Sequence, residues 1–299
     1  MIAIVAALEA ELAAVLDAAR ASGEVTPHTV AGRRFLQGRL AGHDVLLALS
    51  GIGKVAAAAT AAILAERADA VVMVGTAGGI GPGVRTGDVV VADALLQHDV
   101  DARPLFPRWE VEGTVRFLPD EALTHAVSAA ARHVVEAHRA APPASFRELG
   151  IDAPSAHVGL VASGDQFIAT RESSDRLRAD LPGLLAVEME GAALAQVCTM
   201  AGVPFALART ISDRADDEAH LDFPRFLDAV AAPYAHDLVL GLLAHLPLGG
   251  GVARRVVSDQ QIFELDANAR SAWEELNARP AGELPGLAAL FRRPTPFAE

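Results

Sequence analysis

The sequence predicts an α/β fold, in which short apolar strands alternate with helices along most of the chain. The strand-like runs, such as residues 70–74, are short and apolar, and stretches with the helical period stand between or after them. The chain has 299 residues, of which 52% are hydrophobic, so it can bury a large core and is far too apolar to be disordered.

The expected elements follow from these patterns in chain order. Strands are expected at residues 2–7, 34–40, 44–50, 70–74, 88–96, 157–162, 184–187 and 205–211. Helices are expected at residues 9–21, 54–67 (rich in alanine), 121–138, 171–181, 190–200 and 224–245. Gly42 supplies a turn between the second and third strands, which therefore form an antiparallel pair.

The domain organisation changes near residue 245. Pro247 and the three glycines at residues 249–251 indicate a linker, and the chain after them has weak helical periodicity and a proline-rich end. We therefore expect one α/β domain over residues 1–245. Residues 246–299 are expected to form a linker and a C-terminal extension.

Charge and composition exclude several classes of function. A net charge of −13 argues against a nucleic-acid partner, which requires a basic face, and favours a small-molecule partner. No apolar stretch of membrane-spanning length is free of charges, glycine or proline, so no membrane partner is expected. The single cysteine, Cys198, cannot form an internal disulfide and is expected to be a buried structural thiol in a cytoplasmic protein.

Two carboxylates surround Met189 where an apolar strand meets a helix of small residues. Glu188 and Glu190 stand at the carboxyl end of that strand, which is where open α/β sheets bind their ligands. An acid there can bind a substrate hydroxyl. The alternative is a pair of acids that complements the dipole of the following helix.

Two glycine-rich segments, residues 50–54 and 75–83, follow strands, and their amides could face an anion or a ribose. Thr76 adds a hydroxyl to the second. Neither segment has the spacing of a Walker loop or a dinucleotide fingerprint, and both could be tight turns. Asp213 directly follows another apolar strand, so it could act as a general acid or cap a helix. Metal-ligand spacing is lacking around it, and we expect neither a metal nor a cofactor.

Seven motifs, taken together and in order, resemble the 5′-methylthioadenosine/S-adenosylhomocysteine nucleosidases over about residues 1–245. These motifs are Ala7-Leu8-Glu9-Ala10-Glu11, Ser50-Gly51-Ile52-Gly53-Lys54-Val55-Ala56-Ala57, Gly75-Thr76-Ala77-Gly78-Gly79, Gly87-Asp88-Val89-Val90, Ser163-Gly164-Asp165-Gln166-Phe167-Ile168, Val187-Glu188-Met189-Glu190 and Arg209-Thr210-Ile211-Ser212-Asp213. The resemblance implies a three-layer αβα sandwich with a central mixed sheet, of the nucleoside phosphorylase/hydrolase type. It also implies a homodimer.

The resemblance implies a role for each of three acids. Asp213 would protonate or hydrogen-bond purine N7, Glu190 would bind the ribose hydroxyls with the Met189 backbone, and Glu11 would orient and deprotonate the attacking water. Further substrate-binding residues implied are Thr76, Ala77, Gly78, Phe167 (stacked on the base), Ile168, Val187, Glu188, Arg209 and Ser212. The pocket for the 5′ group is expected at Ile52, Leu105 and Phe106. Arg103 or Arg108 could bind a substrate carboxylate there or lie on the surface.

Water is favoured over phosphate as the nucleophile. Phosphate normally requires an arginine near the glycine-rich strand end, and residues 71–75 supply none. A carboxylate at Glu11 would repel phosphate but serve water as a base. Three functions remain open. The first is a hydrolase of 5′-methylthioadenosine or S-adenosylhomocysteine that releases adenine, and the second is a hydrolase of another purine nucleoside, such as futalosine, or a phosphorylase. The third is a nucleoside-binding sensor, which we would expect to lack at least one of the three acids.

Overall fold

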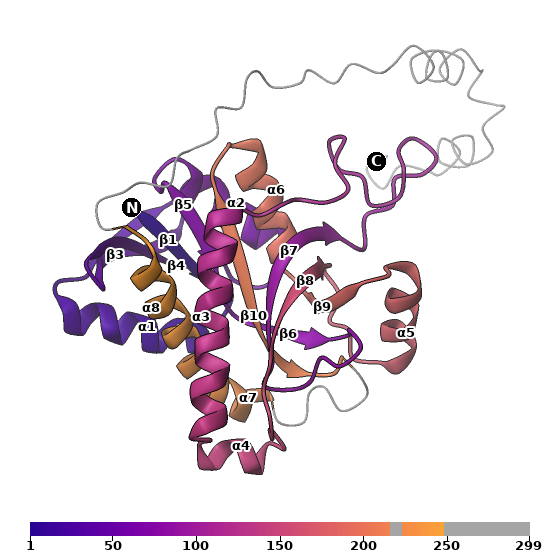
Figure 1. Cartoon of the computed structure of the whole chain (residues 1–299). Coiled ribbons are helices and arrows are strands. Elements are labelled where there is room, and N and C mark those ends of the chain that lie inside the picture. Colours follow the sequence, from indigo (N-terminus) through magenta and orange to yellow (C-terminus); the bar gives the residue numbers. More distant parts are fainter. Residues whose placement is uncertain (216–222, 248–299) are drawn as a thin grey trace, which may run out of the picture. The chain divides into compact units, whose positions relative to one another are not determined.

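A mixed sheet of ten strands runs through the described residues, 1–215 and 223–247 of this computed structural model (Figure 1). The strands are β1 (Ile2–Ala6), β2 (Thr26–Val30), β3 (Arg33–Leu40), β4 (His43–Leu49), β5 (Ala70–Met73), β6 (Thr76–Gly79), β7 (Val89–Gln97), β8 (Ala156–Ser163), β9 (Leu184–Glu188) and β10 (Phe205–Asp213). Their order across the sheet is β2-β3-β4-β1-β5-β10-β6-β9-β8-β7. Because β7 also pairs with β10, the second half of the sheet closes on itself.

Helices cover both faces of the sheet, which confirms the predicted αβα arrangement (Figure 1). They are α1 (Glu9–Ser22), α2 (Lys54–Ala65), α3 (Glu121–Ala140), α4 (Ala144–Glu148), α5 (Arg171–Asp180), α6 (Gly191–Met200), α7 (Phe223–Phe226), a π-helical turn (Leu227–Ala231) and α8 (Ala232–His245). Buried side chains of α1, α3 and α8 share one core, and those of α2 and α6 share another.

The continuous apolar strands are explained by burial on both faces. In β1, Ile2 and Ile4 belong to the core under α1, α3 and α8, whereas Ala3 and Val5 belong to the core under α2 and α6. Successive side chains of a strand point to opposite faces, so a strand between two helical layers must be apolar at every position. All five residues of β1 are accordingly buried.

The strand directions bring distant segments together. Strands β4, β1, β5 and β10 are mutually parallel neighbours, so their carboxyl ends lie at one edge of the sheet. The segments that follow these four strands begin at Ala7 (after β1), Ser50 (after β4), Val74 (after β5) and Arg214 (after β10). The fold thus positions the motifs that begin or end at these segments around one place.

Several elements differ from the sequence-based expectation. Strand β2 was not expected, because its residues are largely exposed and its sequence TPHTV has no apolar run. Strand β6 lies inside the glycine-rich segment for which the sequence suggested a ligand-binding backbone or a tight turn. It is held between β10 and β9 by backbone pairing, which needs no side chains. Helix α4 forms within residues 139–150. Residues 248–299 lie outside the described residues, so the domain boundary near residue 245 stays a prediction.

One helical segment among the described residues, Phe223–His245, is long and apolar enough to cross a membrane, with a mean hydropathy of 1.3. Half of it is buried inside the protein. Tyr234, Leu238 and Leu242 on α8 belong to the core shared with α1 and α3. The apolar composition of this segment therefore serves the packing of a core helix.

Candidate active site

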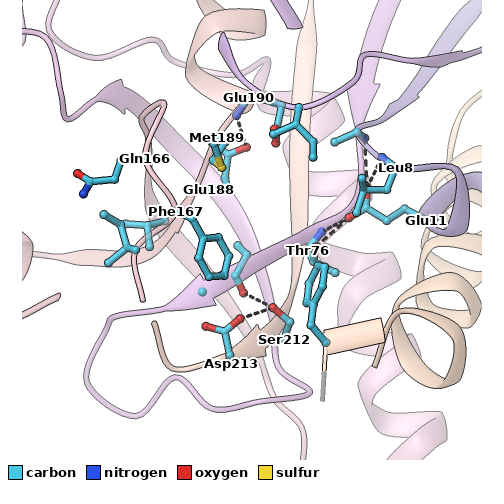
Figure 2. A pocket seen from close by; sticks show the side chains of 17 residues that line it. Leu8, Glu11, Thr76, Gln166, Phe167, Glu188, Met189, Glu190, Ser212 and Asp213 are labelled. Carbon is cyan, nitrogen blue, oxygen red and sulfur yellow. Dashed lines mark hydrogen bonds between the residues drawn. The ribbon is translucent and has the colours of Figure 1, made fainter. Parts of the chain in front are cut away.

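A cavity of about 140 Å³ lies at the carboxyl edge of the sheet, and six of the seven motifs line it (Figure 2). The motif Gly87-Asp88-Val89-Val90 contributes no lining residue, and Asp88 instead accepts the Ser155 N–H at 2.7 Å. Its lining residues are Ala7, Leu8, Glu11, Ile52, Thr76, Ala77, Gly78, Gln166, Phe167, Ile168, Val187, Glu188, Met189, Glu190, Ser212, Asp213 and Phe223. We call this cavity the cleft. Figure 2 shows Glu11 on one side of it and Asp213 on the other.

Glu11 is held in one orientation by four hydrogen bonds. Its Oε2 accepts the backbone N–H groups of Ala7 (3.1 Å) and Leu8 (3.0 Å), which belong to the turn from β1 into α1. Its Oε1 accepts the N–H (2.8 Å) and the hydroxyl (2.9 Å) of Thr76 at the start of β6. Because its donors come from two segments, this buried carboxylate also connects α1 to the glycine-rich strand.

Glu188 is surrounded by donors and anchors the β9–α6 junction. Its Oε2 accepts the N–H groups of Glu190 (3.0 Å) and Gly191 (2.7 Å) and pairs with the guanidinium of Arg209. Its Oε1 accepts the hydroxyl of Ser163, at the end of β8. Glu188 thereby satisfies the first amides of α6, and the neighbouring Glu190 is left to point elsewhere.

Glu190 has fewer hydrogen-bond donors around it than Glu188. Its Oε1 accepts the Gly53 N–H at 2.9 Å, and its Oε2 lies 3.5 Å from Nη2 of Arg209. Burial, together with the nearby negative charge of Glu188, raises the pKa of Glu190 to about 7. This carboxyl group therefore changes its charge near neutral pH.

Arg209 lies behind the cleft and not in it. The residue is 0% exposed; Nη1 donates to the Val74 carbonyl at 3.0 Å, and Nη2 faces Glu188 and Glu190. A Cβ on Gly75 would come within 2.3 Å of Nη1, so only glycine at that position leaves room for the guanidinium. The arginine thus compensates two buried acids and has no surface in the cleft.

Asp213 ends β10 at the opposite side of the cleft. Its Oδ1 accepts the Ala215 N–H at 2.7 Å, and its Oδ2 accepts the hydroxyl of Ser212 at 2.6 Å (Figure 2). The same hydroxyl lies 3.4 Å from the Ala77 carbonyl on β6. A Cβ on Gly78 would approach Asp213 Oδ1 to 3.1 Å, so the glycine of β6 permits this close packing.

The apolar wall of the cleft stands beside Asp213. Phe167 is 52% exposed, which is unusual for a phenylalanine and leaves its ring face available to a planar ligand. Ile168, Val187 and Met189 line the same cavity, and Ile52 approaches from the segment before α2. Acidic groups and an aromatic ring thus face one space.

The structure brings together most of the residues that the sequence suggested. Arg209 is adjacent to the cleft but does not line it, and Leu105 and Phe106 do not line it within one chain. Both arginines considered for a substrate carboxylate have partners in the chain: Arg103 pairs with Asp101, and Arg108 with Asp180 at 2.9 Å.

Four lining residues were not singled out from the sequence. Ala7, Leu8 and Gln166 lie inside recognised motifs next to chosen residues, so their positions could have been found from the motifs. Phe223, at the start of α7, had no signal in the sequence, because it lies outside the seven motifs.

Comparison with known proteins agrees with this geometry. The model of the phosphorylase superfamily matches residues 1–244. The 5′-methylthioadenosine/S-adenosylhomocysteine nucleosidase of Geobacillus thermodenitrificans is 37% identical over 245 residues, which are 81% of this chain and 95% of that protein. The chain belongs to the 5′-methylthioadenosine/S-adenosylhomocysteine nucleosidase family. The resemblance inferred from the seven motifs is thereby confirmed.

Solved structures give the same result and add one neighbour with another activity. The nucleosidase from Neisseria meningitidis in complex with methylthio-immucillin-A is 32% identical with a TM-score of 0.72, covering 82% of this chain and 99% of that one. A futalosine hydrolase mutant of Helicobacter pylori is 28% identical with a TM-score of 0.69, covering 82% and 99%. The solved structures that resemble this chain thus include both a nucleosidase and a futalosine hydrolase.

Proposed function

We propose that this protein hydrolyses the N-glycosidic bond of a 5′-substituted adenine nucleoside, 5′-methylthioadenosine or S-adenosylhomocysteine, and releases adenine. The observation that carries this proposal is the separation of three carboxyl groups around one cleft. Glu11, Glu190 and Asp213 each have a different set of hydrogen-bond partners. Cleavage of a glycosidic bond needs three such groups, one each for the water, the sugar and the base.

The charge that develops in the reaction explains this need. As the bond breaks, positive charge grows on the ribose and negative charge on the departing purine. Groups that act on those charges in the transition state accelerate the reaction. A site with an acid at the base, a carboxylate at the sugar and a base beside the water meets all three demands.

Glu190 binds the ribose hydroxyls in this proposal. Its ionised carboxylate can accept a hydrogen bond from each of two neighbouring hydroxyls, and it also faces the positive charge of the sugar. Because its pKa is raised to about 7, the binding form is lost as the pH falls below that value. Arg209 keeps the carboxylate partly ionised at neutral pH by its positive charge.

Glu11 orients the water and takes its proton. The backbone amides of Ala7 and Leu8 fix one carboxylate oxygen, so the other keeps its direction toward the cleft. The Thr76 hydroxyl can rotate away from Oε1 of Glu11 and form a hydrogen bond with the water. Oε1 can then accept a hydrogen bond from the same water. Rigid placement matters because the water must approach C1′ in one direction.

Asp213 and Phe167 hold the base. Asp213 protonates or hydrogen-bonds purine N7, while the half-exposed Phe167 ring stacks on the purine and the Ile168 backbone contacts its edge. General acid catalysis contributes roughly 10²–10⁴-fold to such reactions. The remaining polar and backbone contacts come from Ala77, Gly78, Val187, Glu188, Met189 and Ser212.

Water is the better nucleophile for this cleft. Among its described lining residues there is no lysine or arginine, and two of the acids, Glu11 and Glu190, face the sugar side. The adjacent guanidinium of Arg209 is buried and already pairs with Glu188 and Glu190. A phosphate dianion would therefore enter an acidic site without a cation of its own.

The proposal is tested by following adenine release from 5′-methylthioadenosine. In water enriched with heavy oxygen the label should appear in the free sugar, and added phosphate should yield no sugar-1-phosphate. That ester as the main product would make the protein a phosphorylase. Release from futalosine at a higher kcat/KM than from 5′-methylthioadenosine would assign the other substrate, and binding without release would indicate a sensor.

We also propose that two copies associate in the cytoplasm. Apolar side chains stand exposed on the two segments that the Lys54–Asp99 contact joins, including Val55 (81%) on α2 and Leu105 (59%) after Asp99. A second copy would cover them, next to the expected 5′ pocket at Ile52. Sedimentation of the protein and its Val55→Asp variant tests this, since a monomeric wild type would contradict it.

A further inference from the structure

Helix α2 begins at the edge of the cleft without a cap of its own. Its N-cap residue is Gly53, which has no side chain to accept the first amides of the helix, and its φ of +92° is one that other residues rarely adopt. Two acids from distant segments accept hydrogen bonds from the amides at this helix start instead. Glu190 accepts the Gly53 N–H at 2.9 Å, and Asp165 Oδ1 accepts the Lys54 N–H at 2.7 Å.

A third acid closes a network around this helix start. The Lys54 ammonium donates to Asp99 Oδ1 at 2.6 Å, and Asp99 Oδ2 accepts the Asp165 N–H at 2.9 Å. Lys54 therefore contacts Asp165 through its backbone and Asp99 through its side chain. Although burial opposes the shift, the hydrogen bonds from Lys54 and from the Asp165 amide lower the pKa of Asp99, so this acid is ionised at neutral pH.

We propose that Lys54, Asp99 and Asp165 form a positioning network that holds the Gly53 amide on Glu190 and keeps the segment bearing Phe167 beside it. None of the three lines the cleft, so their effect on the reaction is indirect. The inference rests on the proposed function for its catalytic consequence only. The network joins the segment that would fix the sugar-binding acid to the one that would stack on the base.

The network has a consequence for the charge of Glu190. The Gly53 N–H favours the ionised carboxylate, while burial and the charges of Glu188 and Glu11 favour the protonated form and Arg209 opposes them. When the Gly53 amide moves away, the pKa of Glu190 rises further. The acid limb of kcat/KM, which reports ionisation of the free enzyme, then moves to higher pH.

Asp165 offers a matched pair of variants. Asp165→Ala removes both the charge and the acceptor for the Lys54 N–H, whereas Asp165→Asn removes the charge but keeps an acceptor oxygen. Loss of a negative charge alone would lower the pKa of Glu190. A rise of the acid limb in Asp165→Ala but not in Asp165→Asn therefore isolates the hydrogen bond from the charge.

Two further variants complete the design. Lys54→Met keeps the aliphatic stem and removes the ammonium. The control is Asp180→Asn, which removes the charge from the Arg108–Asp180 ion pair. This pair is matched in exposure, because the side chains of Arg108 and Asp180 are 27% and 30% exposed and those of Lys54 and Asp99 are 17% and 30% exposed. We expect Asp165→Ala and Lys54→Met to lower kcat/KM about tenfold to a hundredfold, since small misplacements of bound groups have effects of this size. The control should stay within about twofold of wild type.

Amide hydrogen exchange tests the network without any substrate. The backbone amides of residues 51–54 should exchange faster in Asp165→Ala and Lys54→Met than in wild type, Asp165→Asn and Asp180→Asn. Unchanged exchange in both variants overturns the network, and faster exchange with an unchanged kcat/KM and pH profile overturns its positioning role. A wild-type protein that releases no adenine contradicts the proposed function, whereas the exchange measurement still tests the network.

Discussion

Replacement of Glu190 by glutamine should stabilise the protein at pH 8 while it impairs adenine release. The Glu190 side chain is buried, and its pKa is raised from an ordinary 4.5 to about 7 by burial and by Glu188. An acid whose pKa is higher in the folded than in the unfolded chain lowers stability wherever it is ionised in the unfolded chain. The neutral amide of glutamine removes this cost and can still accept the Gly53 N–H.

The magnitude follows from the pKa difference. One pKa unit corresponds to about 1.4 kcal/mol, so a rise from 4.5 to about 7 corresponds to roughly 3 kcal/mol at and above pH 7. Below pH 4.5 the carboxyl is protonated in both states, and the cost is absent. Between these values the wild type loses stability as the pH rises. Glu190→Gln should therefore gain roughly 3 kcal/mol at pH 8 and almost nothing near pH 4.5.

Urea denaturation at pH 4.5 and pH 8 measures this difference. Glu136→Gln, at an exposed position of α3, is the matched control because its charge is solvated in both states. It should change stability by less than about 0.5 kcal/mol at either pH. The reasoning is refuted if the gain of Glu190→Gln does not grow with pH, or if the variant is less stable than wild type at pH 8.

Three further predictions concern catalysis and the buried charges. Asp213→Asn should lower turnover at least about a hundredfold with little change in Tm, because the amide keeps an acceptor for the Ala215 N–H but is not an acid; near-normal turnover contradicts the role. Arg209→Met should cost about 3–5 kcal/mol in urea denaturation, since Glu188 and Glu190 stay buried without their cation; a loss below about 1 kcal/mol argues against this. Burial of the methylthio group should raise kcat/KM for 5′-methylthioadenosine over adenosine by about one to two orders of magnitude, and equal values would exclude an apolar 5′ pocket.

The strands that are buried on both faces were predictable, whereas those held by backbone pairing were not. A run such as Ala70–Met73 is apolar at every position because both faces are covered, so its pattern reveals it. Strands Thr26–Val30 and Thr76–Gly79 have exposed or glycine residues, and hydrogen bonds to neighbouring strands create them. Such bonds are made by the backbone, which is the same in every sequence.

Most residues that line the cleft were predictable from the sequence, but their contacts were not. The motifs around Glu11, Glu190 and Asp213 are contiguous in the sequence, and comparison with a family finds contiguous motifs. The network of Lys54, Asp99 and Asp165 joins residues that are 45 to 111 positions apart. Its members carry no signal until the sheet brings their segments to one edge.

The sequence by itself determined the alternation of strands and helices, the family, and the acids available for the reaction. Only the tertiary structure decided which partners and which surroundings those acids have. Glu188 and Glu190 are two residues apart and chemically alike, yet Glu188 is surrounded by donors while Glu190 has a pKa near 7. The physical reason is that protonation depends on burial and on charges such as that of Arg209, which the fold brings from another strand.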